Sequence, residues 1–279
     1  MTGPSAIFRE GLLEGQVAIV SGAGSGLGRE TALELTRLGM TVVGCGRREE
    51  PLAETAEMAG ERFDPRKGDI REEDQVALLV DGALERHGRI DLLVNNAGGQ
   101  YLTPAEDITP KGFRTVMRLN VEGTWLMTHA VATKAMIPAG GGKVVSITLT
   151  PHAGMPGMVH SGAARAAVEN MTRTLSIEWA RHGILLNAIA PGPFGTDTFL
   201  TKYPKPIVDG AASTVPLQRL GRPEEIAWLV AYLSSPAGDF TTGAVIDVDG
   251  ARNNWFGPWP PAAIATDSGS VVAEERRPR

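Results

Sequence analysis

A glycine-rich loop near the start of the chain lies between an apolar run and an amphipathic segment. Residues 16–21 are mostly apolar with β-branched side chains, which predicts a buried strand, and residues 29–38 have apolar positions at helical spacing. Gly22, Gly26 and Gly28 give the spacing G-x-x-x-G-x-G instead of the strict G-x-G-x-x-G. Unpaired N–H groups and a positive dipole at a helix start favour a pyrophosphate, so the loop predicts a dinucleotide site. The alternative is an ordinary turn between a strand and a helix.

A second apolar run, residues 41–45, ends at a pair of arginines, Arg47 and Arg48. In a dinucleotide fold this position meets the adenine ribose, where an acidic side chain accepts from a 2′-hydroxyl and arginines bind a 2′-phosphate. The acid is missing here, so we expect NADP(H) to be preferred, with NAD(H) as an alternative. The other interpretation is that both arginines start a solvated helix ahead of Glu49 and Glu50.

Strand-like and helix-like patterns alternate along most of the chain. The runs that predict strands are residues 16–21, 41–45, 63–69, 90–94, 143–147, 184–189 and 244–248. The runs that predict helices are residues 29–38, 51–59, 72–87, 110–135, 160–180 and 223–233. This alternation predicts an α/β fold with a doubly wound, seven-stranded parallel sheet and right-handed crossovers. Asn120 interrupts the longest predicted helix, and we expect it to cap or bridge another group.

Composition and charge narrow the class of protein. The 279 residues are 42% hydrophobic, which is enough for one large α/β core. The net charge is −5 without a basic stripe, so we expect no nucleic-acid partner. Cys45 is the only cysteine, which excludes an intrachain disulfide and favours a reducing cytoplasm. No apolar run approaches the ~18 residues of a membrane span, and residues 1–15 lack the apolar core of a signal peptide, so we expect a soluble cytoplasmic protein that does not bind a membrane. The histidines lack metal-ligand spacing, so we expect no metal site.

Several separated motifs together are far more specific than the glycine loop. They are Ser21-Gly22, Gly26-Leu27-Gly28, Asp69-Ile70, Asn95-Asn96-Ala97-Gly98, Asn120 and Pro191-Gly192-Pro193-Phe194-Gly195-Thr196. Over residues 12 to about 252 the chain resembles the short-chain dehydrogenase/reductase family. The resemblance implies a Rossmann-like single domain over residues 12–252, between an N-terminal arm (residues 1–11) and a C-terminal extension (residues 253–279), and a homotetramer.

The resemblance also implies roles for individual residues. Asp69 and Ile70 would lie at the adenine, and the segment from Asn95 to Gly98 would lie along the adenosine ribose and the fourth predicted strand. Pro191, Gly192 and Thr196 would lie at the nicotinamide. With the glycine loop and the two arginines, the residues expected to bind the cofactor are Ser21, Gly22, Gly24, Ser25, Gly26, Leu27, Arg47, Arg48, Asp69, Ile70, Asn96, Ala97, Gly98, Arg165, Pro191, Gly192 and Thr196.

Within the family, three further segments point to a subgroup. Residues 99–106, 159–166 and 247–250 look like those of peroxisomal trans-2-enoyl-CoA reductases and related bacterial proteins. Some of those relatives are described as dehydrogenases of the terpene alcohol citronellol. The resemblance therefore implies either an acyl-thioester substrate or a terpene alcohol.

The chain departs from the family at the catalytic centre. Most members carry Tyr-x-x-x-Lys on a helix, with a serine about thirteen residues earlier. Here Ser161 takes the tyrosine position, Arg165 takes the lysine position, and Leu149 falls at or beside the serine position. None of Tyr101, Tyr203 and Tyr232 lies on that helix, whereas Asn120 matches the family residue that orders a water beside it.

The substitutions change the chemistry available to the centre. Positions 161 and 165 share one helix face, so Arg165 can bind the nicotinamide ribose and stabilise negative charge, but an arginine cannot cycle a proton. Ser161 is a poor acid without help. The residues that could supply part of a substitute are His160, Thr148, Thr150 and His152, and the alternative for His160 is a capping or packing role. We thus assign catalytic roles to Asn120, Ser161, Arg165, His160 and Thr148.

Two hydride reactions differ in their need for a proton donor. Reduction of a ketone makes a basic alkoxide, whereas reduction of the C=C of an enoyl thioester makes an enolate that fixed donors can hold before the carbon is protonated. We therefore expect NADPH-dependent reduction of an enoyl thioester. Two alternatives remain: an NAD(P)-dependent dehydrogenase of terpene or long-chain alcohols, and a nucleotide-binding module without catalysis.

Large aromatic side chains gather after the last predicted strand. Trp255, Phe256 and Trp259 lie among prolines, and each of them is large enough to bury some ~150 to 250 Å². We expect residues 253–261 to pack against another subunit and help close an acyl site; packing on their own subunit is the alternative. The rest of the extension, residues 262–279, is small and polar, which predicts disorder.

Overall fold

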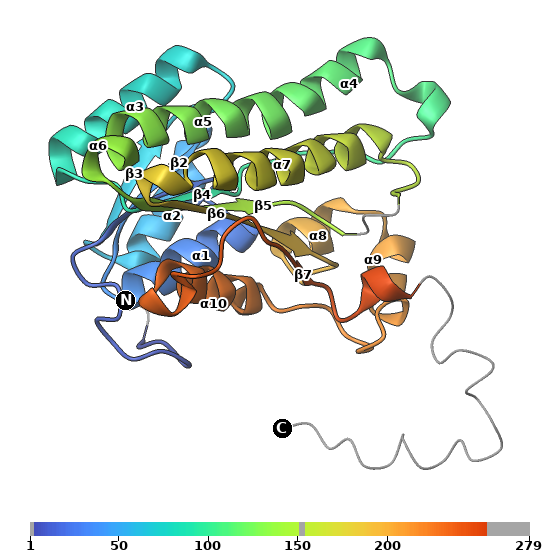
Figure 1. Ribbon diagram of the computed structural model, residues 1–279. Coiled ribbons are helices and arrows are strands. Elements are labelled where there is room, and N and C mark those ends of the chain that lie inside the picture. The colour runs from blue at the N-terminus through green and yellow to red at the C-terminus, as the bar shows by residue number, and fades with distance from the viewer. Residues whose placement is uncertain (1–2, 151–153, 256–279) are drawn as a thin grey trace.

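The computed structural model describes residues 3–150 and 154–255. In this part of the chain seven parallel strands form one sheet, in the order β3-β2-β1-β4-β5-β6-β7 (Figure 1). The strands are β1 (Val17–Ser21), β2 (Thr41–Gly46), β3 (Phe63–Lys67), β4 (Leu92–Asn95), β5 (Gly142–Ile147), β6 (Ile184–Pro191) and β7 (Val245–Val248). β1 pairs with β2 on one side and with β4 on the other, so the strand order reverses between β1 and β4. The predicted doubly wound, seven-stranded parallel sheet is confirmed.

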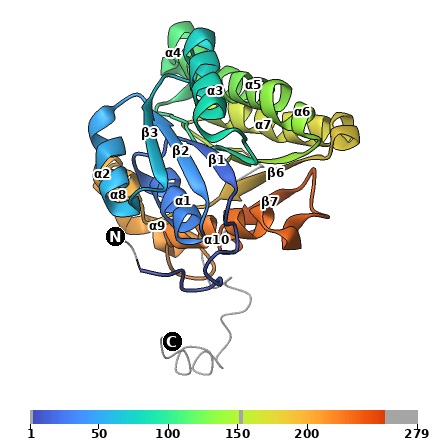
Figure 2. The same ribbon diagram turned by 90° about the vertical axis from the view of Figure 1, so that its left-hand side faces the viewer.

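Helices cover both faces of the sheet (Figures 1 and 2). They are α1 (Gly26–Arg37), α2 (Glu49–Ala59), α3 (Glu73–His87), α4 (Pro110–Met117), α5 (Gly123–Val131), α6 (Ile137–Ala139), α7 (Val159–Glu178), α8 (Asp197–Lys202), α9 (Lys205–Ala211) and α10 (Pro223–Ser234). α1, α2 and α10 pack on one face, and α3, α5 and α7 pack on the other. The sheet is therefore the middle of three layers.

Alternate residues of the central strand belong to the two different cores. Ala18 and Val20 of β1 lie in the apolar cluster beneath α1 and α10. Val17 and Ile19 lie in the cluster beneath α3 and α5. Since both faces of the strand are covered, an unbroken apolar run is stable there, which is why strand prediction from apolar runs succeeds in this fold.

The helix predicted over residues 110–135 is present, but two π-helical turns interrupt it. Residues 118–122 form the turn between α4 and α5, and residues 132–136 form the turn between α5 and α6. Thr109 caps the start of α4 by accepting a hydrogen bond from the backbone N–H of Gly112 at 3.0 Å. Single π turns are frequent at functional sites, and Asn120 lies fully buried in the first of them.

Some element boundaries differ from those expected. α1 begins at Gly26 inside the glycine loop, and β3 ends at Lys67 instead of Asp69. α8 and α9 follow β6 in a segment outside the predicted helices. No helix in the described ranges is long and apolar enough to cross a membrane. The expected packing of residues 253–261 concerns a segment that lies, beyond Trp255, outside the described residues.

Candidate active site

The carboxyl ends of β1 and β4 meet where the strand order reverses, which is the usual ligand site of such sheets. Ser21, at the end of β1, holds the two ends together. Its Oγ accepts from the backbone N–H groups of Asn96 and Ala97, both at 3.0 Å, and donates to the carbonyl of Val94 at 3.3 Å. Asn96 returns a hydrogen bond from its side-chain Nδ2 to the carbonyl of Ser21 at 2.9 Å. Ser21 and Asn96 thus build the floor of the site.

The glycines of the loop are needed for different structural reasons. Gly22 and Gly26 have φ angles of +70° and +56°, a region that side chains disfavour. A Cβ at Gly28 would overlap Asn96 Nδ2 and the carbonyl oxygen of Gly22, so Gly28 allows α1 to pack against β4. A Cβ at Gly26 would meet nothing closer than Thr196 at 3.7 Å. A side chain at position 26 would therefore be opposed by the φ angle and not by crowding.

The start of α1 suits an anion. Its first turn contains no acidic residue, and the N-cap Ser25 makes no side-chain capping bond, so the first N–H groups are left for a ligand. Arg29 supports the loop from behind, since it donates to the carbonyl of Gly24 at 2.6 Å and pairs with Glu54 at 2.6 Å. The first-turn N–H groups and the absence of an acidic side chain beside them fit a pyrophosphate.

Positive charge gathers where the adenine ribose of a dinucleotide would lie. Arg47 and Arg48 follow β2, are exposed, and form no ion pair within the described residues. Hydrogen bonds from Arg71 hold the pKa of Asp69 below its usual value, and the charge of Arg47 acts in the same direction. Asp69 thus stays ionised with its charge compensated by the neighbouring arginines, and Ile70 beside it is buried.

Asn120 fixes the backbone that leaves β4. From the π turn its Nδ2 donates to the carbonyls of Gly99 and Val116, at 2.8 and 2.9 Å. Its Oδ1 accepts from the N–H of Gly99 at 3.2 Å. The side chain therefore bridges its own helix to the loop after β4, in agreement with the prediction that Asn120 caps or bridges another group.

Arg165 lies at the carboxyl ends of β4 and β5. One guanidinium nitrogen donates to the carbonyl of Ile147 at 2.9 Å, and a Cβ at Gly98 would overlap the guanidinium. Its Nε is buried and has no hydrogen-bond partner within the described ranges. Burial lowers the pKa of Arg165 to about 10, partly offset by Tyr203, so the group stays positively charged at neutral pH. A fixed cation thus faces the space between the two strand ends.

Ser161 belongs to a network that the sequence did not suggest. Its buried Oγ donates to Oε1 of Gln100 at 2.6 Å, and Nε2 of Gln100 donates to the hydroxyl of Tyr203 at 3.0 Å. Gln100 comes shortly after β4, and polar residues at the carboxyl ends of parallel strands are candidates for a ligand site. Its position could therefore have been used to predict it as a site residue. Tyr203 directly follows α8, 103 positions later than Gln100, and nothing in the linear pattern connects the two.

The proposed proton-path residues are placed differently from Ser161. Nδ1 of His160 accepts the N–H of Ser161 at 3.0 Å, and its ring packs edge-on against Tyr101 at 4.4 Å. The ring contact matches a packing role, but the start of α7 has no side-chain capping bond, and Nε2 of His160 is buried without a hydrogen-bond partner in the described ranges. The hydroxyl of Thr148 donates to the carbonyl of Ile189 at 3.3 Å, and that of Thr150 makes a similar contact across to β6. His152 lies outside the described residues.

The segment after β6 forms the remaining wall. The backbone N–H of Gly192 donates to the carbonyl of Val248 at 3.0 Å, and a Cβ on Gly192 would lie 2.7 Å from the Cβ of Asp249. Thr196 caps α8 by accepting from the N–H of Phe199 at 3.2 Å, which places its side chain over Gly26. This wall therefore closes the space opposite the glycine loop.

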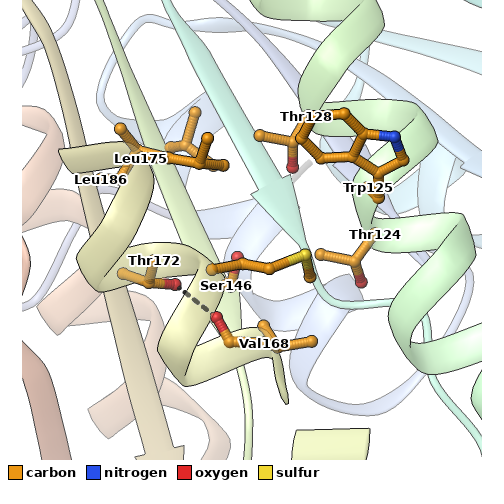
Figure 3. A pocket seen from close by; sticks show the side chains of 10 residues that line it. Thr124, Trp125, Thr128, Ser146, Val168, Thr172, Leu175 and Leu186 are labelled. Carbon is orange, nitrogen blue, oxygen red and sulfur yellow. Dashed lines mark hydrogen bonds between the residues drawn. The ribbon is translucent and has the colours of Figure 1, made fainter. Parts of the chain in front are cut away.

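A separate pocket lies between α5 and α7 (Figure 3). Thr124, Trp125 and Thr128 face Val168, Thr172 and Leu175 across it. None of the site residues described above lines this pocket. No cluster of histidine, cysteine or acidic side chains suited to a metal ion occurs within the described part of the chain.

Comparisons with known proteins agree with this geometry. Residues 22–251 match the family model described as "Enoyl-(Acyl carrier protein) reductase". A probable 2,4-dienoyl-CoA reductase of Bacillus subtilis is 35% identical over 89% of this chain and 100% of that protein. A peroxisomal 2,4-dienoyl-CoA reductase of Pongo abelii is 37% identical over 88% of this chain and 86% of that protein.

A solved structure gives the same result. The citronellol catabolism dehydrogenase of Pseudomonas aeruginosa is 42% identical, with a TM-score of 0.79 over 88% of this chain and 98% of that one. Matches of this extent cover the glycine loop, the Asn120 turn and the segment after β6 alike. The chain belongs to the short-chain dehydrogenase/reductase family, whose members use a nicotinamide nucleotide.

Proposed function

We propose that this protein reduces the C=C of an enoyl thioester of the trans-2-enoyl-CoA type, with NADPH as the hydride donor. The observation that carries the proposal is Arg165, a buried and permanently charged group in the place of the family's lysine. Such a cation stabilises an enolate without having to deliver a proton to it. The names of the reductases from Bacillus subtilis and Pongo abelii support the same substrate class.

The cofactor, when bound, supplies hydride; the chain's own residues position it and stabilise charge. The loop around Gly26 and the start of α1 would hold the pyrophosphate, and Arg47 and Arg48 would hold a 2′-phosphate. One guanidinium nitrogen of Arg165 is held by the carbonyl of Ile147, and the other would contact the nicotinamide ribose. The two exposed arginines form no ion pair within the described residues, which supports a preference for NADP(H) over NAD(H).

Asn120 and Gln100 prepare the substrate side of the site. Asn120 holds Gly99 by both its N–H and its carbonyl, which fixes the position of the next residue, Gln100. One N–H of Gln100 goes to Tyr203, and its amide carries a second N–H. That second donor is available to a thioester oxygen, so the negative charge of an enolate would be shared between amide and guanidinium.

A second candidate is an NAD(P)-dependent dehydrogenase of terpene or long-chain alcohols. The citronellol catabolism dehydrogenase of Pseudomonas aeruginosa, at 42% identity, favours this candidate. The partly exposed apolar side chains of Leu102, Val159 and Leu200, at the segments that border the site, suit an isoprenoid chain as well as an acyl chain.

A substrate panel separates the candidates. Oxidation of NADPH is measured with a trans-2-enoyl-CoA and with a 2,4-dienoyl-CoA, and reduction of NADP⁺ and NAD⁺ with citronellol and geraniol; products are identified by mass. Turnover of either thioester with no turnover of the alcohols supports the proposal. Turnover of the alcohols alone overturns the proposal. If none of the four compounds is turned over although NADPH binds tightly, the protein is a nucleotide-binding module without catalysis.

The proposal extends to assembly and compartment. We propose a cytoplasmic homotetramer, on the strength of the family resemblance and of the exposed apolar side chains of Trp125 on α5 and Ile177 on α7. Size-exclusion chromatography with light scattering measures the mass, and a monomer at micromolar concentration would contradict the assembly.

A further inference from the structure

The three tyrosines of the chain have different surroundings, and only one has its hydroxyl within the site. The ring of Tyr101 packs on His160, and its hydroxyl lies against Gly112 at the start of α4. Tyr232 is on α10 and is partly exposed. Tyr203 directly follows α8 and bonds Gln100, two residues beyond the Gly98 that contacts Arg165. The described site thus contains a phenol, although it comes from another segment than in most of the family.

The direction of the hydrogen bonds leaves the phenol proton free. Ser161 donates to Gln100, and Gln100 in turn donates to Tyr203, so the oxygen of Tyr203 is an acceptor in this chain. Within the described residues no acceptor receives the hydrogen of that hydroxyl. A half-buried phenol with its donor unused is suited to bond an oxygen of a ligand.

The position of the Tyr203 ring is fixed by its neighbours. Phe199 of α8 packs against the ring of Tyr203, with centroids 5.2 Å apart. Pro204 follows at once and restricts the backbone. Arg165 interacts electrostatically with Tyr203, so the guanidinium and the phenol border the same part of the site.

We propose that Tyr203 is a catalytic residue that donates its phenolic proton to the substrate's carbonyl oxygen, and so replaces the tyrosine missing at position 161. The inference rests on the proposed thioester reduction. Bound NADPH would supply a hydride to C3 of the acyl chain, the π pair of the C=C would form the enolate, and the enolate oxygen would take the proton of Tyr203. Water then protonates Cα, the enol proton returns to the tyrosinate, and NADP⁺ and the saturated thioester leave. Each turnover consumes one hydride and one solvent proton.

The test compares Tyr203→Phe with the unaltered enzyme and with Tyr232→Phe as a matched control. Phenylalanine keeps the ring contact with Phe199 and removes only the hydroxyl. Loss of one preorganised donor should lower kcat about 100-fold or more with KM raised by no more than about tenfold, and the control should stay within about twofold. Normal kcat in Tyr203→Phe, with an active unaltered enzyme, would overturn the inference and leave the proposed function standing.

A binding measurement gives a readout that does not depend on turnover. Calorimetry compares a saturated acyl-CoA with its thioether analogue, which lacks the carbonyl oxygen, in the presence of NADP⁺. The unaltered protein should prefer the thioester, and Tyr203→Phe should lose roughly two- to tenfold of that preference, the effect of one neutral hydrogen bond. An unchanged preference would refute the contact with the oxygen. Absence of all acyl-CoA binding and turnover in the unaltered protein would instead refute the proposed function.

Discussion

Replacing Asn120 with alanine tests how the π turn supports the site. The side chain is fully buried and makes three hydrogen bonds, two to Gly99 and one to the carbonyl of Val116. At about 0.5 to 1.5 kcal/mol each, their loss should lower the free energy of unfolding by roughly 1.5 to 4.5 kcal/mol. For a chain of this size that corresponds to a drop in Tm of roughly 3 to 8 °C.

The substitution should also reduce activity, because Gly99 would no longer hold Gln100 in place. Asn120→Asp provides a sharper version, since a carboxylate has no hydrogen to donate to the carbonyls of Gly99 and Val116. We expect it to be at least as destabilising as the alanine variant, although its volume is unchanged.

Urea unfolding followed by tryptophan fluorescence, at one fixed protein concentration, measures the effect. Thr115→Ala is the control, because Thr115 lies on the same long helix, is exposed, and makes one local bond to the carbonyl of Lys111. It should change the free energy of unfolding by no more than about 0.5 kcal/mol. If Asn120→Ala matched this control in both stability and kcat, the bridging role assigned to Asn120 would be refuted.

Three further outcomes are expected. Arg165→Ala should lower kcat about 100-fold or more because the buried charge is lost, and Arg165→Lys should recover part of it; near-normal kcat in the alanine variant would contradict the role of the guanidinium. Joint replacement of Arg47 and Arg48 by alanine should weaken NADPH about tenfold or more in fluorescence titration and leave NADH nearly unchanged; equal weakening of both would exclude 2′-phosphate recognition. Burial raises the pKa of Cys45 to about 12, so a thiol reagent at pH 8 should label it only in urea, and rapid labelling of the native protein would show that the thiol is accessible.

The fold was largely predictable because its strands are covered on both faces. Runs such as residues 41–45 are apolar without interruption, and their alternation with amphipathic segments leaves few topologies to consider. The boundaries were less predictable where backbone geometry decides them. α1 starts at Gly26 because the glycine loop turns directly into the helix, and glycine itself carries no helical signal.

Site residues were predictable where one side chain binds the backbone nearby, and less predictable where side chains from distant segments contact each other. Asn120 could be singled out because a buried amide has no reason to interrupt a helix, and it does bridge two segments. The contact from Gln100 to Tyr203 joins segments 103 positions apart, and only the fold brings them together. Thr148 shows the converse, since its place in the chain suits the site while its hydroxyl is bonded to the neighbouring strand.

The crowding at Gly28 changes what the glycine motif can be taken to mean. Because a Cβ there would strike Asn96 and Gly22, a relative that had lost its nucleotide would still need this glycine to keep α1 against the sheet. Gly26 meets no such crowding, since a Cβ there would lie 3.7 Å from Thr196, but its φ of +56° is a conformation that asparagine and aspartate adopt more readily than other side chains. Among related sequences, an asparagine or aspartate at position 26 beside an intact position 28 would therefore mark a retained fold with an abandoned cofactor.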